Sequence, residues 1–399
     1  MRFFLLCVAA LFATCVQSQT DSLHADCDKA INLNLFKKHH QAAPSGYGRR
    51  LEVSGKGKNN ARSIEQEHNT VWYTFTIPSD GKLAFDLIPD EVKDDYDFML
   101  YKKEGEVFCA DLSEKKLNPI RANISRNNTK LESKTGLNDK ARYDFNPPGV
   151  NDAFSKSLDV FAGEVYYLLV DNVYPNGKGH TLVFHFPFTL QGKVVDSASL
   201  APLSAKVTLI DLRKGDTLAS AQSNTETGMF DLPIESADTI RWQLSFQSSG
   251  YFFEYIILTQ NSLPGMVQKP RTQRMRKIEV NKTFVLKDIN FAPSSDVILP
   301  ISYPALKELL NLMQQNLLLK ISIEGHTNGV GSKDKGEKHH LELSSARAKA
   351  VSKFLTDNGI NADRIGTVGY GYSKMLFPNA SSVQQMNANM RVEIKIISY

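Results

Sequence analysis

Residues 321–351 read ISIEGHTNGVGSKDKGEKHHLELSSARAKAV and combine the patterns of a strand, a polar turn and a helix. Ile321 and Ile323 alternate with polar residues, which is typical of a half-buried strand, and Gly325 ends that pattern. Small polar residues follow, and apolar residues then recur at spacings of three and four from Leu343 onward. We therefore predict a strand, a turn whose backbone N–H groups can face a ligand, and an amphipathic helix.

The predicted helix carries an arginine on its inward-facing side. Arg347 lies four residues after Leu343 and four before Val351, so it projects from the apolar stripe. A charge in that position is costly unless it is paired. Arg347 is therefore either a ligand-binding residue or one half of a structural ion pair, with Glu342 or Glu393 as the candidate partner.

Four separated blocks of this chain resemble the OmpA-like peptidoglycan-binding domain, in the order that the family has them. The blocks are Ile289-Asn290-Phe291, Gly325-His326-Thr327-Asn328, Leu343-Ser344-Ser345-Ala346-Arg347-Ala348 and Asn389-Met390-Arg391-Val392-Glu393. The resemblance implies an α+β domain over 278–399. It also implies binding of the diaminopimelate of peptidoglycan stem peptides.

The free end of diaminopimelate is a zwitterion, which requires an acceptor for its ammonium and a two-pronged donor for its carboxylate. The resemblance places Arg347 on the carboxylate and Asn328 on the ammonium, with Thr327, His340 and Arg391 in support. Three positions depart from the family pattern, because Asn328 replaces aspartate, His340 replaces asparagine and Met390 replaces arginine. Asn328 without a charge is expected to lose about 1 to 2 kcal/mol of binding energy. Its alternative role is that of a turn residue.

The first 18 residues have the pattern of an export signal, with Arg2, an apolar run and small residues near Ser18. An alternative interpretation, a lipoprotein cleavage box, would make Cys15 the lipidated residue. After cleavage near Ser18 only Cys27 and Cys109 remain, and in an exported chain we expect them to form one disulfide. A metal site built on the two cysteines is the weaker alternative.

Residues 19–187 alternate short apolar runs with turn signals, which predicts a β-sandwich. The runs EHNTVWYTF and DDYDFMLYK resemble the jelly-roll-like modules of exported Bacteroidetes-type proteins. This part also contains five acidic residues that either form solvated turns or supply oxygen ligands to calcium. They are Glu67, Asp94, Asp95, Asp97 and Asp171. Trp72 and Tyr73 are expected in the core, and the alternative is a sugar-stacking platform.

Residues 188–260 carry further period-two patterns, such as Trp242, Leu244 and Phe246. This part resembles the carboxypeptidase-regulatory-like fold, a small β-sandwich that serves as a spacer. Residues 261–277 contain prolines and five basic side chains, and we expect them to form a basic linker.

The composition is that of a globular chain, with 23% charged and 42% hydrophobic residues and a formal net charge of +4. This charge is too small to indicate nucleic-acid binding, and we expect no transmembrane segment after removal of the signal. The sequence contains no G-x-S-x-G, H-E-x-x-H or P-loop motif, so we expect neither enzyme activity nor a cofactor or metal.

The sequence as a whole predicts a multidomain β plus α+β protein, with two β-sandwich modules before a C-terminal OmpA-like domain. Its expected role is to link outer-membrane-associated structures to peptidoglycan from the periplasmic side of the outer membrane, with outer-membrane or periplasmic proteins as partners. The alternative is a protein- or carbohydrate-interaction module whose OmpA-like domain no longer binds peptidoglycan. A third interpretation is a calcium-dependent sugar binder.

Overall fold

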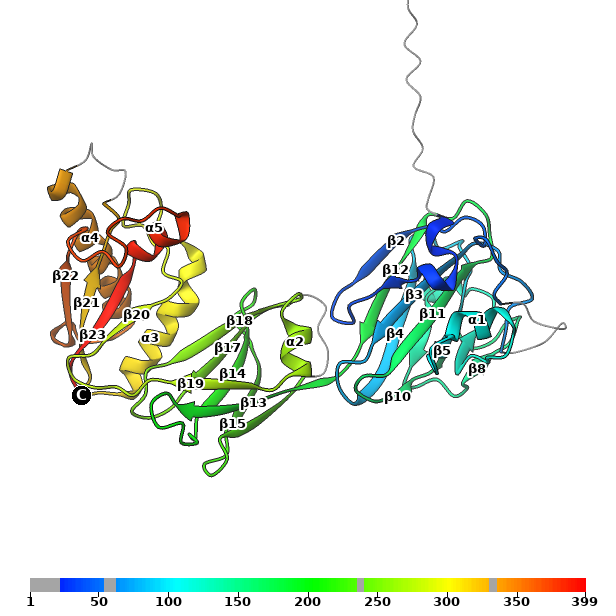
Figure 1. The fold of residues 1–399 in the computed structure, drawn as a ribbon, viewed down its shortest axis with the longest axis horizontal. Helices are drawn as coiled ribbons and strands as arrows, with labels where there is room; N and C mark the ends of the chain where they lie inside the picture. Colours follow the sequence, from blue (N-terminus) through cyan, green and yellow to red (C-terminus); the bar gives the residue numbers. More distant parts are fainter. Residues whose placement is uncertain (1–21, 54–61, 235–239, 330–335) are drawn as a thin grey trace, which may run out of the picture. The chain divides into compact units, whose positions relative to one another are not determined.

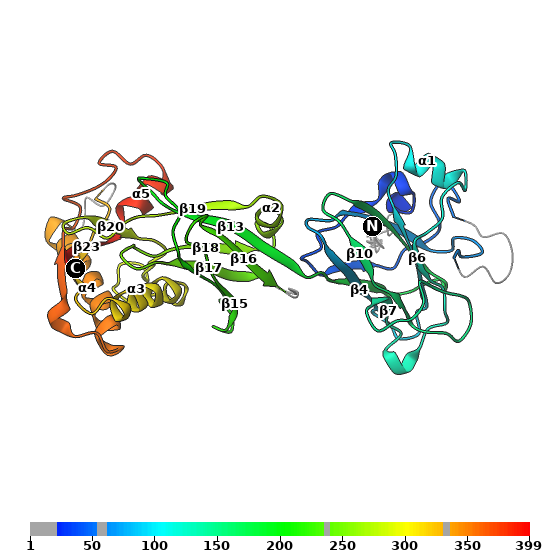
Figure 2. The same cartoon turned by 90° about the horizontal axis from the view of Figure 1, so that it is seen from below.

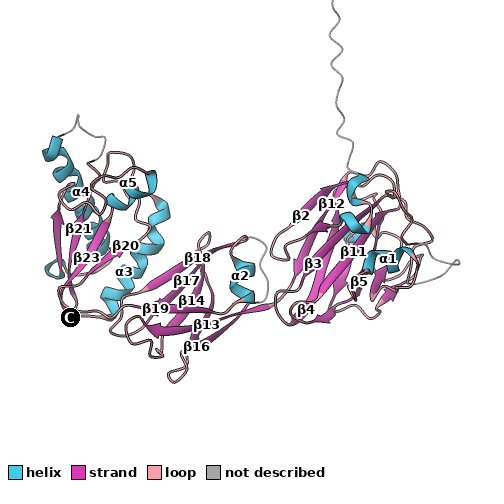
Figure 3. Cartoon of the chain, in the orientation of Figure 1, coloured by secondary structure: helices cyan, strands magenta, loops and turns pink. Residues whose placement is uncertain are grey.

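The computed structural model describes residues 22–53, 62–234, 240–329 and 336–399, so the predicted export signal lies outside the described residues. The chain divides into two compact units, one ending at Phe188 and one covering Thr189–Ile234 and Ile240–Tyr399. Strands dominate both units, and most of the helical residues belong to the C-terminal part (Figure 3). The predicted fold class, several β-sheets followed by a C-terminal α+β domain, is confirmed.

The first unit contains two six-stranded sheets (Figure 1). One sheet has the order β1 (Ile31–Asn32), β3 (Thr70–Thr76), β11 (Val165–Asn172), β5 (Tyr96–Lys102), β6 (Arg121–Asn123) and β8 (Phe145–Asn146). The other has the order β2 (His39–Ala42), β12 (Gly179–His185), β4 (Gly81–Pro89), β7 (Thr135–Asn138) and β9 (Phe154–Lys156), with β10 (Leu158–Val160) beside β4.

Apolar alternation explains how these sheets build a core. In β4, Leu83, Phe85 and Leu87 are fully buried, while the residues between them are only partly buried. Trp72 and Tyr73 of β3 are also buried, at 0% and 1% exposure, so they belong to the core and form no sugar-stacking platform. Both sides of the central part of β3 are therefore covered, which is why Val71, Trp72 and Tyr73 follow one another without a polar residue between them.

The predicted disulfide between Cys27 and Cys109 is present. It joins the 3-10 turn Cys27–Lys29 to the short helix α1 (Phe108–Ser113), two segments separated by 82 positions in the sequence. Both cysteines lie against a cluster of buried residues that includes Trp72, Met99 and Phe108. The disulfide thus fixes two surface segments onto this part of the core.

The second unit begins with a small β-sandwich of two sheets. The three-stranded sheet has the order β16 (Met229–Ile234), β13 (Phe188–Asp196) and β19 (Arg271–Met275). The four-stranded sheet has the order β15 (Thr217–Gln222), β14 (Lys206–Asp211), β17 (Arg241–Gln247) and β18 (Glu254–Thr259).

The prediction of a basic linker at 261–277 is wrong. These residues form α2 (Leu263–Gln268) and strand β19, which pairs in parallel with β13. Leu263, Val267 and Met275 are buried, while the side chains of Arg271 and Arg274 are exposed on the strand. An edge strand of this kind needs few apolar residues, so its sequence has the composition of a linker.

The C-terminal part of the second unit has a four-stranded sheet with the order β20 (Thr283–Leu286), β23 (Val392–Ser398), β21 (Lys320–Gly325) and β22 (Ile365–Gly369). Helices α3 (Tyr303–Gln315) and α4 (Gly336–Asp357) lie beside each other (Figure 2), and α5 (Val383–Asn389) precedes β23. Their buried residues, such as Leu309 and Val351, pack on Ile323 and Ile394 of the sheet. The predicted strand and helix of residues 321–351 are confirmed, and residues 330–335 between them lie outside the described residues.

The small sandwich and the C-terminal sheet share one core. Phe252, which precedes β18, stacks on Phe284 of β20 with ring centroids 4.3 Å apart. The buried carboxylate of Glu308 on α3 accepts hydrogen bonds from Gln243 and Gln247 of β17, each 2.7 Å long. The second sandwich is therefore part of the same compact unit as the C-terminal domain. Among the residues that the structure describes, no helix is long and apolar enough to cross a membrane.

Candidate functional site

The turn after β21 is held by close backbone contacts that only glycine allows. A Cβ on Gly325 would lie 2.1 Å from the carbonyl oxygen of Ser344 on α4, so no larger residue fits there. The carbonyl of Gly325 accepts a hydrogen bond from Tyr370 N, and Thr327 N donates to the carbonyl of Gly371. The GHTN segment is thus fixed between α4 and the chain that leaves β22.

Thr327 and His340 contact each other inside this turn. Thr327 Oγ1 lies 3.1 Å from His340 Nδ1, and the two residues are 3% and 6% exposed. His340 lies on α4 near its beginning. The pair therefore connects the turn to the helix through buried polar atoms, and its members hold each other in place.

Asn328 lies at the position of the family's aspartate and is half-buried. Its Oδ1 accepts a hydrogen bond of 3.0 Å from Asn389 Nδ2 at the end of α5. Asn389 is fully buried and also binds the backbone of Phe377 through both side-chain atoms. These hydrogen bonds connect the turn after β21 to the end of α5 through Asn328.

Arg347 is 9% exposed and lies over the ring of Phe291, with its Cζ 4.9 Å from the ring centroid. Its Nε donates to the carbonyl of Ser295 over 2.9 Å. Burial lowers the pKa of the Arg347 guanidinium, and the negative charge of Asp296 opposes that shift. Neither Glu342 nor Glu393, the two anticipated partners, forms an ion pair with it.

The terminal nitrogens of Arg347 have no hydrogen bond or ion pair to any residue that the structure describes. A guanidinium carries five N–H donors in a planar fork, and Nε uses one of them. The two terminal groups are therefore available for a bidentate contact with a carboxylate from outside the protein.

The guanidinium of Arg391 binds other groups of the same domain. Its Nε donates to Glu393 Oε1 over 2.6 Å, and its Nη2 donates to the carbonyl of Lys374 over 3.1 Å. The imidazole of His326, 3.4 Å away, and the guanidinium of Arg391 hold the pKa of Glu393 at about 2. These contacts give Arg391 a positioning role at the end of β23.

The structure thus connects four of the five predicted site residues. Thr327 contacts His340, and Asn328 is the next residue in the same turn. Arg391 reaches this segment because His326 N donates to its carbonyl. Arg347 contacts a different segment, Phe291 to Asp296, and lies seven residues after His340 on α4. Seven residues rise by about 10 Å, and helical side chains lean toward the N-terminus, so Arg347 leans toward the His340 end.

Two contributors to the site were not predicted as site residues. Asn389 binds Asn328, and the segment around Ser295 binds Arg347. The sequence held a signal for Asn389, because it opens the block Asn389 to Glu393. Nothing in the sequence near Ser295 indicates its contact with an arginine 52 positions away.

The acidic residues of the first unit are buried, so the expectation of solvated turns is wrong. Asp171 and Glu67 are 1% and 2% exposed, and Asp94, Asp95 and Asp97 are all below 9%. Asp171 accepts hydrogen bonds from the backbone of His68 and Asn69, and Asp95 accepts one from Asn127 N. Carboxylates bound in this way hold loops together, and the described part of the chain has no cluster of them close enough to share a calcium ion.

Comparisons with known proteins agree with the C-terminal resemblance. Residues 290–389 match the OmpA family. Outer membrane porin F of Pseudomonas fluorescens is 31% identical over 109 residues, which are 27% of this chain and 32% of that protein. Peptidoglycan-binding protein ArfA of Mycobacterium tuberculosis is 30% identical over 108 residues, again 27% of this chain and 32% of that protein.

Among solved structures, the periplasmic domain of Helicobacter pylori MotB is 24% identical, covers 29% of this chain and 73% of that one, and has a TM-score of 0.26. The chain spans about a third of the length of the two curated relatives. The matched segment contains β21, α4, Asn389, which binds Asn328, and both Phe291 and Ser295, which contact Arg347. The C-terminal part of this chain is therefore an OmpA-like domain, homologous to segments of these bacterial envelope proteins.

Proposed function

We propose that this chain is a non-enzymatic cell-envelope protein that attaches outer-membrane-associated structures to peptidoglycan through its OmpA-like domain. The observation that carries the proposal is the environment of the Arg347 side chain. This side chain is buried, its terminal nitrogens form no hydrogen bond or ion pair with a described residue, and it lies in a segment that matches the OmpA family. A ligand carboxylate would bind these donors in a charge-assisted, two-pronged contact.

The proposed ligand is the free end of diaminopimelate in a stem peptide. Arg347 would take its carboxylate in a two-pronged contact, and the side-chain amide of Asn328 would face its ammonium, as the family's aspartate does. Thr327, His340 and Arg391 would keep the turn and the strand ends in place, since their side chains already bind protein groups. One relative that matches this domain is itself described as a peptidoglycan-binding protein.

We place the protein at the periplasmic side of the outer membrane, after export directed by residues 1–18. The N-terminal sandwich, residues 19–187, and the second sandwich would separate the OmpA-like domain from other outer-membrane or periplasmic proteins. Relatives of the C-terminal domain include outer-membrane proteins, which supports an envelope location. The absence of catalytic sequence motifs supports a binding role without chemistry.

The test is co-sedimentation of the whole chain with purified diaminopimelate-type peptidoglycan. The whole chain is required because Phe252 and Gln243 of the second sandwich complete the packing of the C-terminal domain. Arg347→Ala is expected to weaken binding by about tenfold or more, since charge-assisted hydrogen bonds contribute about 1.5 to 3 kcal/mol. Lys349→Ala, which removes an exposed charge from the same helix, should leave binding unchanged.

Asn328→Asp provides the second arm of the experiment. The variant restores a carboxylate opposite the ligand ammonium, and Asn389 Nδ2 can donate to that carboxylate as it does to the amide. Binding should become stronger by about tenfold. Binding that is insensitive to Arg347→Ala would contradict the proposal. No binding by the wild-type chain, together with binding by Asn328→Asp, would instead favour a domain that now recognises a protein partner.

A further inference from the structure

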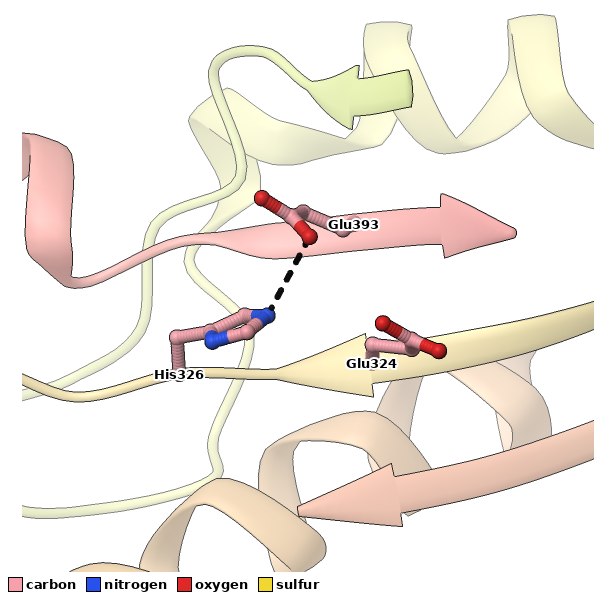
Figure 4. A group of neighbouring side chains, drawn as sticks. All are labelled: Glu324, His326 and Glu393. Atoms are coloured by element: carbon pink, nitrogen blue, oxygen red, sulfur yellow. Dashed lines mark ion pairs between the residues drawn. The ribbon is translucent and has the colours of Figure 1, made fainter. Parts of the chain in front are cut away.

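Three side chains converge on the face of the C-terminal sheet that is turned away from α4. Glu324 of β21 lies directly opposite Glu393 of β23 in the antiparallel register, and His326 follows two positions after Glu324 (Figure 4). Gly325 faces α4, so its neighbours Glu324 and His326 point to the opposite side. The three side chains are therefore separate from the contacts of Arg347 on the helix-covered side.

The first indication of a ligand is the lack of partners for the buried groups. Glu324 is 6% exposed, and its carboxylate has no hydrogen bond or ion pair to another described residue. His326 is 2% exposed, and neither ring nitrogen forms a hydrogen bond within the described chain. Its Nε2 has one charged neighbour, Glu393 Oε2, at 3.4 Å. The two buried ring nitrogens of His326 are costly without partners, and the like charges of Glu324 and Glu393 opposite each other on paired strands are destabilising.

The second indication is the geometry of the three possible ligand atoms. One atom from each residue lies within 4.8 Å of the other two. In a tetrahedral zinc site with bonds of about 2.0 to 2.1 Å, neighbouring ligand atoms are about 3.3 Å apart. The His326 Nε2 to Glu393 Oε2 distance of 3.4 Å already agrees with this value. To complete the site, only the carboxylate of Glu324 must rotate toward His326 Nε2 and Glu393 Oε2.

The surrounding residues orient the group as outer-shell residues orient metal ligands. Arg391 binds Oε1 of Glu393 and leaves Oε2 directed at His326. The ring of Tyr370 stacks on the imidazole with centroids 5.4 Å apart. An imidazole nitrogen with two carboxylate oxygens suits a divalent transition metal better than calcium or magnesium, which prefer oxygen ligands only.

We propose that Glu324, His326 and Glu393 form a binding site for a divalent transition-metal ion, with Zn²⁺ as its probe. The three protein ligands leave at least one coordination position for water or an external group. The metal neutralises the facing carboxylates and joins β21 to β23 at the beginning of the GHTN segment, through His326. The positive charge of Arg391 beside Glu393 reduces the affinity but does not occupy the ligand atoms.

The experiment is calorimetric titration of the untagged whole chain with Zn²⁺, followed by Co²⁺ as a spectroscopic probe. The wild-type chain should bind one more zinc ion than Glu324→Gln, or bind it more than about tenfold tighter. Glu342→Gln, the same change at an exposed position of α4, should behave as wild type. Zinc should also raise the melting temperature of the second unit and leave that of the first unchanged, which excludes the surface histidines His39 and His40.

Cobalt gives a readout that does not depend on the variant. A site of one nitrogen and two oxygens in low coordination gives visible d–d absorption bands, which should be present in wild type and lost in Glu324→Gln. Circular dichroism establishes that the variant is folded. Equal zinc affinity and stoichiometry in wild type and folded Glu324→Gln would overturn the proposal. Absence of cobalt bands in the wild-type chain would overturn it even if the variant failed to fold.

Discussion

At the scale of single residues, burial sets the protonation of two carboxylates in the first unit. Burial raises the pKa of Glu67 to about 8 and that of Glu52 to about 7. Glu52 accepts a hydrogen bond from Cys27 N, and Glu67 accepts one from Val53 N. Both side chains thus hold backbone beside the disulfide and favour their protonated forms.

These pKa values predict how stability changes with pH. In the unfolded chain both groups deprotonate near the ordinary value of 4.5, whereas in the folded chain they retain protons up to about pH 7 and 8. A raised carboxyl pKa means that the folded state is favoured at low pH, and that this advantage is lost as pH rises from about 4.5 to 8. The free energy of unfolding of the first unit should therefore decrease over this range.

Glu67→Gln isolates the contribution of one group, because glutamine is neutral at every pH. At pH 9 the variant should be more stable than wild type by about 2 kcal/mol, or about 5 °C in melting temperature. Thermal unfolding followed by near-ultraviolet circular dichroism between pH 5 and 9 measures the difference. Glu65→Gln, an exposed neighbour, should keep the wild-type slope. Equal slopes for Glu67→Gln and wild type would contradict the assignment.

At the scale of elements, helix α3 is joined to strand β17 by a buried carboxylate. Glu308 is 2% exposed and accepts hydrogen bonds from Gln243 and Gln247, while burial raises its pKa. Glu308→Ala removes two charge-assisted hydrogen bonds and leaves two amides without their acceptor. We expect it to lower the free energy of unfolding of the second unit by about 3 kcal/mol.

Chemical denaturation followed by intrinsic fluorescence tests this expectation, since Trp242 lies in β17 next to Gln243. Lys307→Ala changes the exposed neighbour on the same helix and should alter stability by less than about 0.5 kcal/mol. If Glu308→Ala were no more destabilising than Lys307→Ala, the hydrogen bonds between α3 and β17 would not contribute to joining the sandwich to the OmpA-like domain.

At the scale of the whole molecule, the two compact units predict two unfolding transitions in calorimetry. The disulfide between Cys27 and Cys109 belongs to the first unit, and Glu308 belongs to the second. The double substitution Cys27→Ala, Cys109→Ala should lower the free energy of unfolding of the first unit by about 4 kcal/mol, because the disulfide closes a long loop. The cysteine substitutions should leave the melting temperature of the second unit unchanged, and Glu308→Ala should leave that of the first unit unchanged. If either variant shifted both melting temperatures together, the two units would unfold as one.

Local sequence patterns were sufficient to predict part of this protein. Period-two alternation identified β17 and β21, and the spacing of apolar residues from Leu343 onward identified α4. The order of the short motifs along the chain was enough to indicate the OmpA-like domain. The two cysteines were sufficient to predict the disulfide, since no others remain after the expected cleavage near Ser18.

Every feature that depends on pairing between distant segments was set by the tertiary fold. The sequence of β19 has the composition of a linker. It forms a strand because it pairs in parallel with β13, and Gly192 and Arg271, which face each other in this pair, are 79 positions apart in the sequence. The packing of α4 brings Arg347 to the carbonyl of Ser295. The register of β21 and β23 places Glu324 opposite Glu393. Local patterns report which side of an element is apolar, but they hold no information about which polar groups meet across the fold.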